Sequence, residues 1–206
     1  ELNAKVVLQD VWDVSRAVDL IHQHQVSVTM ASTPFLNDLS TTVAEQHDQV
    51  SSLKTFLCAG APIPGSLVQK ARETLGVKVI SAWGMTECGA ITTTRPEDDD
   101  ERSFSTDGIA LPGVEIKIVN KAGEIKPFNE PGRLMIRSCS SFGGYLKRAH
   151  LNDTDADDWF DTGDIAYQDE QGYIRIWGRK KDVIIRGGEN IPVAEIESLL
   201  YKHPNI

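Results

Sequence analysis

Residues 53–82, LKTFLCAGAPIPGSLVQKARETLGVKVISA, form one strand–helix–strand pattern. The apolar runs 53–58 and 77–82 predict two buried strands, and the periodic apolar positions of 66–75 predict a helix between them. Residues 60–64 are rich in Gly and Pro and predict a loop. A strand, a helix and a second strand in this order are typical of a parallel sheet covered by helices.

The same alternation precedes this stretch. Residues 4–9 and 26–31 predict strands, and residues 13–24 predict a helix that Asp13 can cap. Another helix is expected from residue 32, because a proline two residues later occupies a first-turn position that helices tolerate. We therefore expect an α/β fold in the first half of the chain, with a parallel sheet and flanking helices.

The pattern changes near residue 106, where short strands with closely spaced turns begin. The strands are expected at 114–119, 133–137, 165–167 and 173–177. They indicate an antiparallel region, which we expect to be a small β-barrel. A helix is predicted at 192–201, and a third unit, cut short by the end of the sequence, is expected to begin near residue 182.

The composition is that of an ordinary globular protein, with 40% hydrophobic and 25% charged residues. The net charge of −9 argues against a nucleic-acid partner, and no run approaches the roughly 20 apolar residues of a membrane span. Three widely spaced cysteines suggest neither a zinc site nor a disulfide framework, so a reducing cytoplasm is expected. The acidic run 97–101 is expected to be a solvated loop.

Two clusters follow predicted parallel strands, at the sheet edge where ligands of open α/β sheets bind. The first is Gly60-Ala61-Pro62, whose small residues leave room for a planar ring; taken alone, the cluster is explained better by a plain strand–helix turn. The second is AWGMTE, residues 82–87.

The second cluster offers three different chemical groups. Trp83 can stack on a purine, Thr86 can bond a phosphate oxygen, and Glu87 can bind Mg²⁺, which prefers oxygen ligands. A core tryptophan and a solvated glutamate are the alternatives. Further along, Asp164 can accept both hydroxyls of a ribose, or be a simple turn residue, and Arg179 can bond the same ribose or a phosphate.

Together these stretches resemble the adenylate-forming superfamily, which includes acyl-CoA synthetases, peptide-synthetase adenylation domains and firefly-type luciferases. The shared order is a Gly-Ala-Pro loop, aromatic-Gly-x-Thr-Glu, Thr-Gly-Asp, Gly-Arg-x-x-Asp and a Gly-Gly-Glu-Asn-like stretch, and this chain has all five. The run 178–191 is most similar to fatty acyl- and aromatic acyl-CoA synthetases.

The resemblance implies a role for individual residues. ATP or AMP would be bound by Gly60, Ala61, Pro62, Ala82, Trp83, Gly84, Thr86, Asp164 and Arg179. Catalytic roles are implied for Thr86, Glu87 and Arg179, with Glu87 as the Mg²⁺ ligand. The acyl pocket would include Phe35, Gly60 and Met85, the hinge Lys181 and Asp182, and the CoA channel Gly187 and Gly188.

The resemblance also implies a reaction in two halves, in which a carboxylic acid and ATP give acyl-AMP and pyrophosphate, and CoA then displaces AMP. Its domain plan places the end of an α/β subdomain at 1–106, a β-barrel subdomain at 107–178, a hinge at 179–182 and the start of a C-terminal α+β domain at 183–206. The apolar character of Phe35 and Met85 favours a fatty or other apolar acid.

Two family features are missing, the phosphate loop ending in Pro-Lys-Gly and the catalytic lysine near the C-terminus. We therefore expect an internal fragment of an acid–thiol ligase that is inactive alone. The alternatives are an adenylation domain that loads a carrier protein, or a nucleotide-binding fragment without turnover; a pure interaction module would leave the motifs unexplained. Arg133 replaces the usual Glu after Gly132, and we expect this to be a surface difference.

Overall fold

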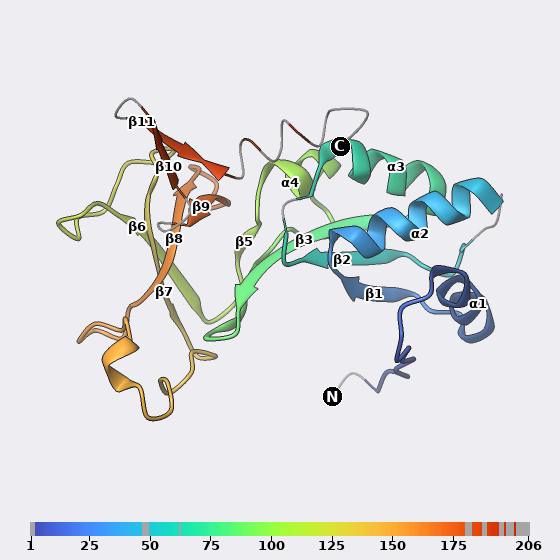
Figure 1. Ribbon diagram of the computed structural model, residues 1–206, viewed down its shortest axis with the longest axis horizontal. Helices are drawn as coiled ribbons and strands as arrows, with labels where there is room; N and C mark the ends of the chain where they lie inside the picture. The colour runs from blue at the N-terminus through green and yellow to red at the C-terminus, as the bar shows by residue number, and fades with distance from the viewer. Residues whose placement is uncertain are drawn as a thin grey trace. The chain divides into compact units, whose positions relative to one another are not determined.

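The computed structural model describes residues 3–46, 50–61, 63–179, 183–186 and 189–193, together with 196 and 200. These form two compact units. Unit 1 comprises residues 1–81 and 95–104, and unit 2 comprises residues 82–94 and 105–206. Figure 1 shows the helices and strands of each unit. The domain boundaries expected at 106, 178 and 182 remain a prediction for the whole protein.

Unit 1 contains the predicted alternation of strands and helices. Its elements are α1 (Val14–His24), β1 (Val28–Ala31), α2 (Thr33–Gln46), β2 (Thr55–Ala59), α3 (Gly65–Leu75), the first half of β3 (Lys78–Met85) and most of α4 (Asp100–Ser105). Strands β1 and β2 pair in parallel, with Ala31 opposite Cys58 at their ends. Helices α2 and α3 pack side by side (Figure 1). The parallel α/β prediction is confirmed.

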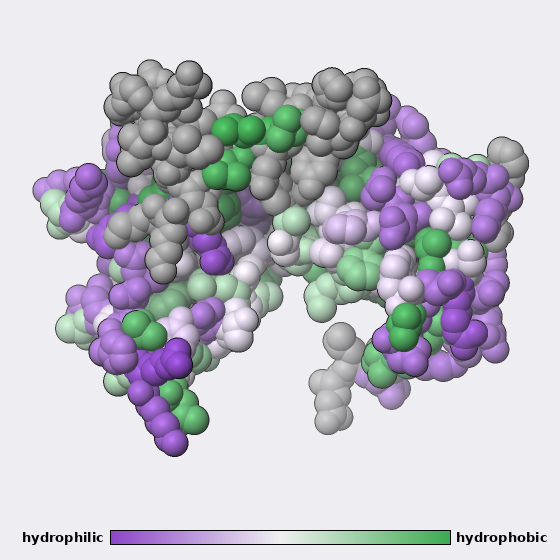
Figure 2. All heavy atoms as spheres, viewed as in Figure 1, coloured by the Kyte–Doolittle hydropathy of each residue, from purple (hydrophilic) through white to green (hydrophobic). Residues whose placement is uncertain are grey.

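The helices of unit 1 form where the sequence supplies caps and an apolar stripe. Asp13 caps α1 by accepting a hydrogen bond from Arg16 N at 2.8 Å. On α2, Leu36, Leu39 and Val43 are buried at helical spacing, and each fully buried side chain of this size contributes about 1.5–3 kcal/mol. Figure 2 shows that the outward surface over α2 and α3 is mainly hydrophilic.

Two expectations for unit 1 are wrong. Residues 4–9 form no strand, and Val6 and Leu8 are 75% and 85% exposed, so no apolar face is buried to hold a strand there. The acidic run is only partly a solvated loop, because Asp100 starts α4 and forms ion pairs with Arg72 and Lys78.

Unit 2 is antiparallel. It contains the end of β3, then β4 (Gly89–Thr93), β5 (Ile109–Ala110), β6 (Val114–Val119), β7 (Gly132–Ser138), the 3₁₀ helix η1 (Ala149–Leu151), β8 (Phe160–Gln168), β9 (Ile174–Arg179), β10 (Val183–Arg186) and β11 (Glu189–Pro192). Strands β6 to β9 form a four-stranded sheet in chain order, and β10 pairs with β11. This confirms the antiparallel region, while its closure into a barrel remains a prediction.

Strand β8 carries a charged residue, Asp164, on its buried face. Its side chains alternate between buried and half-buried, as the period of two in a strand requires. Phe160, Thr162, Asp164 and Ala166 share the buried face. The strand is longer than the expected 165–167, so the Thr-Gly-Asp motif lies inside the sheet rather than before it.

The C-terminal stretch is described at a few positions. Val193, Ile196 and Leu200, which fall within the helix expected at 192–201, are helical. Among the helices in the described part of the chain, none has the length and apolarity required to cross a membrane.

Candidate functional site

The Thr86-Glu87 pair lies on a tight turn between β3 and β4. Strand β3 continues to Met85, beyond the expected end at residue 82, and its pairing with β4 shifts register between Trp83 and Gly84. A side chain at Gly84 would place a Cβ 2.1 Å from the carbonyl oxygen of Gly89, so only glycine permits this close approach. The backbone therefore presents Thr86 and Glu87 at a fixed turn.

Trp83 and Met85 are both half-buried and pack against the apolar core of unit 2. That core includes Cys88, Ile91, Leu134 and Phe160. Trp83 is thus partly a core residue, as the alternative interpretation held, but its ring is not enclosed. Thr86 is exposed and Glu87 is half-buried, so both polar groups are accessible at the turn.

Sequence reasoning missed the loop that holds this turn. Phe142 N donates to the backbone oxygen of Glu87 at 2.7 Å, and Ser140 Oγ donates to the oxygen of Cys88 at 2.6 Å. The Tyr145 hydroxyl donates to Glu87 Oε1 at 2.7 Å. The only signal in the sequence is the aromatic-Gly-Gly-aromatic run that ends at Tyr145.

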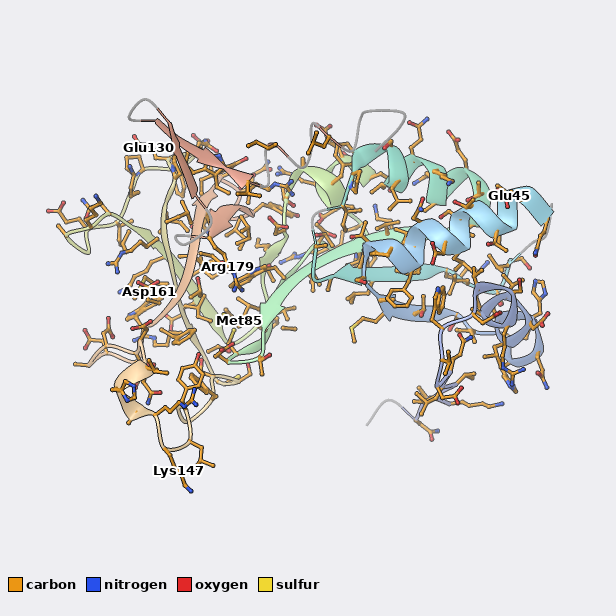
Figure 3. The ribbon with its side chains drawn as sticks, viewed as in Figure 1. Glu45, Met85, Glu130, Lys147, Asp161 and Arg179 are labelled. Atoms are coloured by element: carbon orange, nitrogen blue, oxygen red, sulfur yellow. The ribbon has the colours of Figure 1, made fainter. Side chains whose placement is uncertain are left out.

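Asp164 is 3% exposed and lies opposite Arg179 in the pairing of β8 with β9. Arg179 Nε is 3.2 Å from Asp164 Oδ1, and Figure 3 labels Arg179 on β9 and Asp161 on β8. Burial raises the pKa of Asp164 above its ordinary value, although the Arg179 guanidinium opposes the shift. The two residues that the sequence assigned to one ribose are therefore in contact.

Cys88 connects the two halves of the predicted nucleotide site. Burial raises the pKa of its thiol to about 11, and the charges of Glu87 and Asp164 both contribute to the increase, while a hydrogen bond with the Met85 backbone opposes it. Cys88 and Phe160 belong to one apolar core, which joins the turn that carries Glu87 to the strand that carries Asp164, although 77 positions separate these two carboxylates in the sequence. The β3–β4 turn and the Thr-Gly-Asp strand meet in unit 2.

The other predicted ligand-binding residues belong to unit 1. Thr33, at the start of α2, contacts Cys58 Sγ at 3.7 Å, which brings α2 to the carboxyl end of β2. Gly60 follows that strand with a φ of +90°, a conformation that favours glycine. Phe35 packs edge-on against Trp12, with ring centres 4.8 Å apart.

Phe35 and the Gly60 loop thus lie in the same unit, whereas Met85, the third predicted acyl-pocket residue, belongs to unit 2. Ala61 is exposed. Five predicted residues lie outside the described part of the chain, namely Pro62, Lys181, Asp182, Gly187 and Gly188. Their roles remain predictions.

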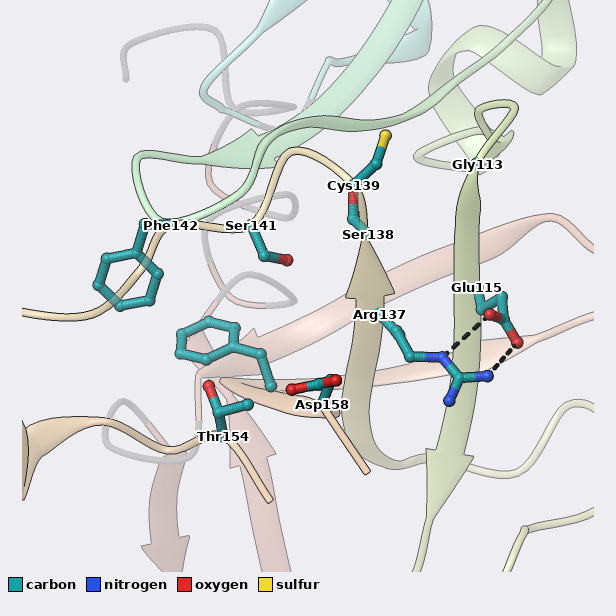
Figure 4. Close-up of a pocket in the computed structure, with 10 residues that line it drawn as sticks. Gly113, Glu115, Arg137, Ser138, Cys139, Ser141, Phe142, Thr154 and Asp158 are labelled. Carbon is teal, nitrogen blue, oxygen red and sulfur yellow. Dashed lines mark hydrogen bonds and ion pairs between the residues drawn. The ribbon is translucent and has the colours of Figure 1, made fainter. Parts of the chain in front are cut away.

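A cavity of about 450 Å³ in unit 2 is separate from these residues (Figure 4). It is lined by Gly113, Glu115, Arg137, Ser138, Cys139, Ser141, Phe142, Thr154, Asp158 and Phe160. Arg137 donates two hydrogen bonds of 3.0 and 2.8 Å to Glu115, its neighbour on the adjacent strand, and these already pair its charge. None of the predicted nucleotide-binding residues lines this cavity.

The donor atoms at the β3–β4 turn fit a magnesium ion that is shared with a substrate. In the described part of the chain, no group of three or more His, Cys, Asp or Glu side chains can hold a metal ion by itself. The turn offers the Glu87 carboxylate and the Thr86 hydroxyl, which are oxygen donors. Mg²⁺ commonly binds one or two carboxylates and completes its shell with waters and substrate phosphates.

Arg133 is not the surface difference that the sequence suggested. Its Nη1 lies 2.7 Å from Asp161 Oδ2, and the two side chains are only 29% and 18% exposed. Arg133 Nε is buried and has no hydrogen-bond partner among the described residues. The exchange of Glu for Arg is therefore matched by a negative residue on the neighbouring strand.

Comparison with known proteins places the chain among its relatives. The family model described as AMP-binding enzyme matches residues 2–146. The chain is 36% identical to the medium-chain fatty-acid–CoA ligase of Escherichia coli, covering 100% of this chain and 36% of that protein. It is also 36% identical to the 2-succinylbenzoate–CoA ligase of Bacillus pumilus, covering 98% of this chain and 40% of that protein.

The fold agrees with a solved structure. O-succinylbenzoate coenzyme A synthetase from Bacillus subtilis, in complex with ATP and magnesium ion, superposes with a TM-score of 0.84 at 33% identity. The match covers 94% of this chain and 40% of that one, so the chain spans less than half the length of these relatives. The family model covers most of the chain, and the identities exceed 30%. The chain therefore belongs to the AMP-binding enzyme family.

Proposed function

We propose that this chain is part of an ATP-dependent acyl-CoA synthetase. The enzyme would activate a carboxylic acid as acyl-AMP, release pyrophosphate, and transfer the acyl group to CoA with release of AMP. One observation in the structure carries this proposal: Phe142 donates to the backbone oxygen of Glu87 at 2.7 Å and packs against Phe160, which shares the buried face of β8 with Asp164. The carboxylate proposed for a metal and the carboxylate proposed for a ribose would thus belong to one site.

Asp164 is well suited to bind the ribose of AMP. A buried carboxylate gains little from water, so two ribose hydroxyls would satisfy acceptor sites that solvent does not reach. Arg179 holds Oδ1 on one side and keeps the negative charge compensated. Its 62% exposed side chain can also donate to a phosphate oxygen, as a guanidinium does well.

The turn residues would bind the phosphates. Thr86 is exposed and can donate its hydroxyl to a phosphate oxygen, while Glu87 would hold Mg²⁺ together with the nucleotide. When bound, Mg²⁺ offsets negative charge on the phosphates. Catalysis by this chain's residues is then mainly a matter of positioning the acid's carboxylate and the α-phosphorus in line.

The acid would be fatty or otherwise apolar. Phe35 is a half-buried aromatic ring in unit 1, and Met85 is a half-buried apolar side chain in unit 2. The names of two relatives, a medium-chain fatty-acid ligase and a 2-succinylbenzoate ligase, support an acid with a hydrocarbon part. A cytoplasmic location is consistent with three cysteines that form no disulfide.

The test uses the full-length protein with ATP, Mg²⁺ and a panel of carboxylic acids. We expect AMP release that requires CoA, with straight-chain or aromatic acids preferred over short polar acids. Omitting CoA while keeping hydroxylamine in the assay separates acyl-AMP formation from thiol transfer. Turnover with a phosphopantetheinyl carrier protein, but not with CoA, would instead favour the carrier-loading alternative.

The 206-residue chain by itself is expected to bind a nucleotide weakly and to turn nothing over, because the phosphate loop and the catalytic lysine are absent from its sequence. ATP–pyrophosphate exchange measures this directly. Robust exchange by the purified chain would contradict the roles assigned to those two missing features.

A further inference from the structure

The contacts of Glu87 differ in kind from those of a solvated turn residue. Two of the hydrogen bonds from the loop of residues 140–145 fix the backbone of the turn, and the third fixes the Glu87 side chain through the Tyr145 hydroxyl. We propose that Tyr145 is a positioning residue, which orients the Glu87 carboxylate toward a divalent cation shared with the nucleotide phosphates. This inference rests on the proposed function.

The bond between Tyr145 and Glu87 is of a strong type. A hydroxyl that donates to an ionised carboxylate forms a charge-assisted hydrogen bond, and the 2.7 Å distance lies in the range of such bonds. A carboxylate has about four acceptor sites, and Tyr145 uses one of them on Oε1. The carboxylate therefore keeps acceptor sites for a cation while its orientation is fixed.

Tyr145 is itself held in place. Its ring packs edge-on against Phe142 at 4.8 Å, and Phe142 packs in the same way against Phe160 of β8 at 5.7 Å. Tyr145 N donates to Asn152 Oδ1 at 2.9 Å. The preceding Gly144 has a φ of +114°, and a Cβ there would lie 2.5 Å from Asn152 Nδ2.

The Tyr145 hydroxyl, by holding Glu87 in one orientation, lowers the side-chain entropy that is lost when a metal ion binds. Without the hydroxyl, Glu87 would sample several rotamers at its half-exposed position, and the cation would have to restrict them on binding. Residues that orient a metal ligand typically change metal affinity by roughly 10–100-fold, and we expect about tenfold here because the pair is solvent-accessible. Saturating metal would restore the rate, since the chemistry itself does not use Tyr145.

The test compares Tyr145→Phe with Tyr167→Phe in the full-length protein, because both remove one hydroxyl and Tyr167 is a half-buried tyrosine of β8. Manganese binding in the presence of ATP is followed by electron paramagnetic resonance. We expect Tyr145→Phe to raise the Kd for Mn²⁺ about tenfold and to raise the KM for Mg²⁺ with kcat retained. The ring packing survives in this variant and the lost hydrogen bond is solvent-exposed, so only a small fall in Tm is expected.

A Kd for Mn²⁺ within about twofold of the wild type in Tyr145→Phe overturns the positioning role. Glu87→Gln, measured in parallel, separates this from failure of the proposed function. If Glu87→Gln weakens Mn²⁺ binding and Tyr145→Phe does not, only the inference about Tyr145 is rejected. If Glu87→Gln also leaves binding unchanged, the metal role of Glu87 and the inference fall together.

Discussion

Asp164 and Arg179 face each other across β8 and β9, and a 3.2 Å contact joins a carboxylate that is 4% exposed to a guanidinium that is 62% exposed. The arrangement is asymmetric, because burial penalises the charge of Asp164 far more than that of Arg179. A buried carboxylate that is only partly compensated is costly for folding and useful for a ligand that supplies hydroxyl donors.

We expect Asp164→Asn to stabilise the protein at neutral pH and to weaken nucleotide binding. Burial raises the folded-state pKa of Asp164 above its ordinary value of 3.8. Between the ordinary and the raised pKa, the folded state therefore binds more protons than the unfolded state. Wild-type stability is therefore lost as pH rises, and the amide, which never ionises, avoids that loss. Loss of the charged acceptor should weaken AMP binding by about 10–100-fold.

Thermal unfolding from pH 4 to 8, with titration of AMP by calorimetry, measures both effects. The gain in Tm should shrink as the pH falls and Asp164 becomes protonated. Asp19→Asn, on the exposed face of α1, is the control and should change neither quantity. A variant less stable than the wild type at neutral pH would show that Arg179 compensates the charge fully.

Gly84→Ala is expected to disrupt the turn that carries Thr86 and Glu87. The added Cβ would meet the backbone oxygen of Gly89 at 2.1 Å, and neither backbone segment can move without breaking the β3–β4 pairing. We expect a loss of about 2 kcal/mol or more in the free energy of unfolding. Denaturant titration and ATP binding check this.

Gly143→Ala is a matched control in the same region, because a Cβ at Gly143 meets no atom within 4 Å. It should leave stability nearly unchanged. If the two alanine variants were equally stable, the close approach of β3 and β4 would not constrain the turn.

Asp161→Asn tests the Arg133–Asp161 pair. The amide keeps the shape and the bond from Gly163 N to Oδ1, but it leaves the Arg133 guanidinium without its opposite charge. Because both side chains are mostly buried, we expect a loss of about 1–2 kcal/mol in the free energy of unfolding. Urea titration of both proteins at low and high salt measures it.

Glu115→Gln is the surface counterpart, since the Arg137–Glu115 pair is 41% and 59% exposed. Solvent and salt screen such a pair, so no measurable change is expected. Equal effects in the two variants would mean that burial adds nothing to the Arg133 pair.

Asp100→Asn should weaken the attachment of α4 in a pH-dependent way. Burial raises the pKa of Asp100, but hydrogen bonds and charges from Lys78 and Arg72 outweigh it and lower the pKa below 3.8. The stabilisation is therefore present above pH 3.8 and is lost as the pH falls through the folded-state pKa. At pH 7 we expect a cost of about 0.5–1 kcal/mol, because the carboxylate is 28% exposed.

The difference between Asp100→Asn and the wild type should shrink in thermal unfolding as the pH falls below 3.8. Asp99→Asn changes a neighbouring exposed carboxylate and should have no such profile. A difference that persisted at low pH would indicate that the amide perturbs α4 itself rather than its ion pairs.

The sequence predicted those parts of the fold that depend on neighbours along the chain. Asp13 begins α1 as expected, and the β-branched run before Ala31 forms β1. The Thr-Gly-Asp motif was correctly paired with Arg179, although the length of β8 was underestimated. Local caps and periodic apolar positions carry this information.

What the sequence could not reveal depends on distant partners. Tyr145 bonds to a residue 58 positions away, and the acidic run becomes helical where Arg72 and Lys78 meet Asp100. For residues 4–9 a strand was predicted that does not form. Their apolar pattern is typical of a strand, but Val6 and Leu8 remain exposed. In each of these cases, the local structure depends on whether the residues find partners that are distant in the sequence.

The three thiols are protected to very different degrees. Cys58 and Cys88 are enclosed, and burial keeps both sulfur atoms protonated at neutral pH, whereas Cys139 is exposed. A maleimide fluorophore should therefore attach at one position of the native chain without any mutagenesis. Because the hydroxyl of the adjacent Ser140 bonds to the backbone of Cys88, such a dye is expected to report changes at the neighbouring turn, including the nucleotide binding proposed there.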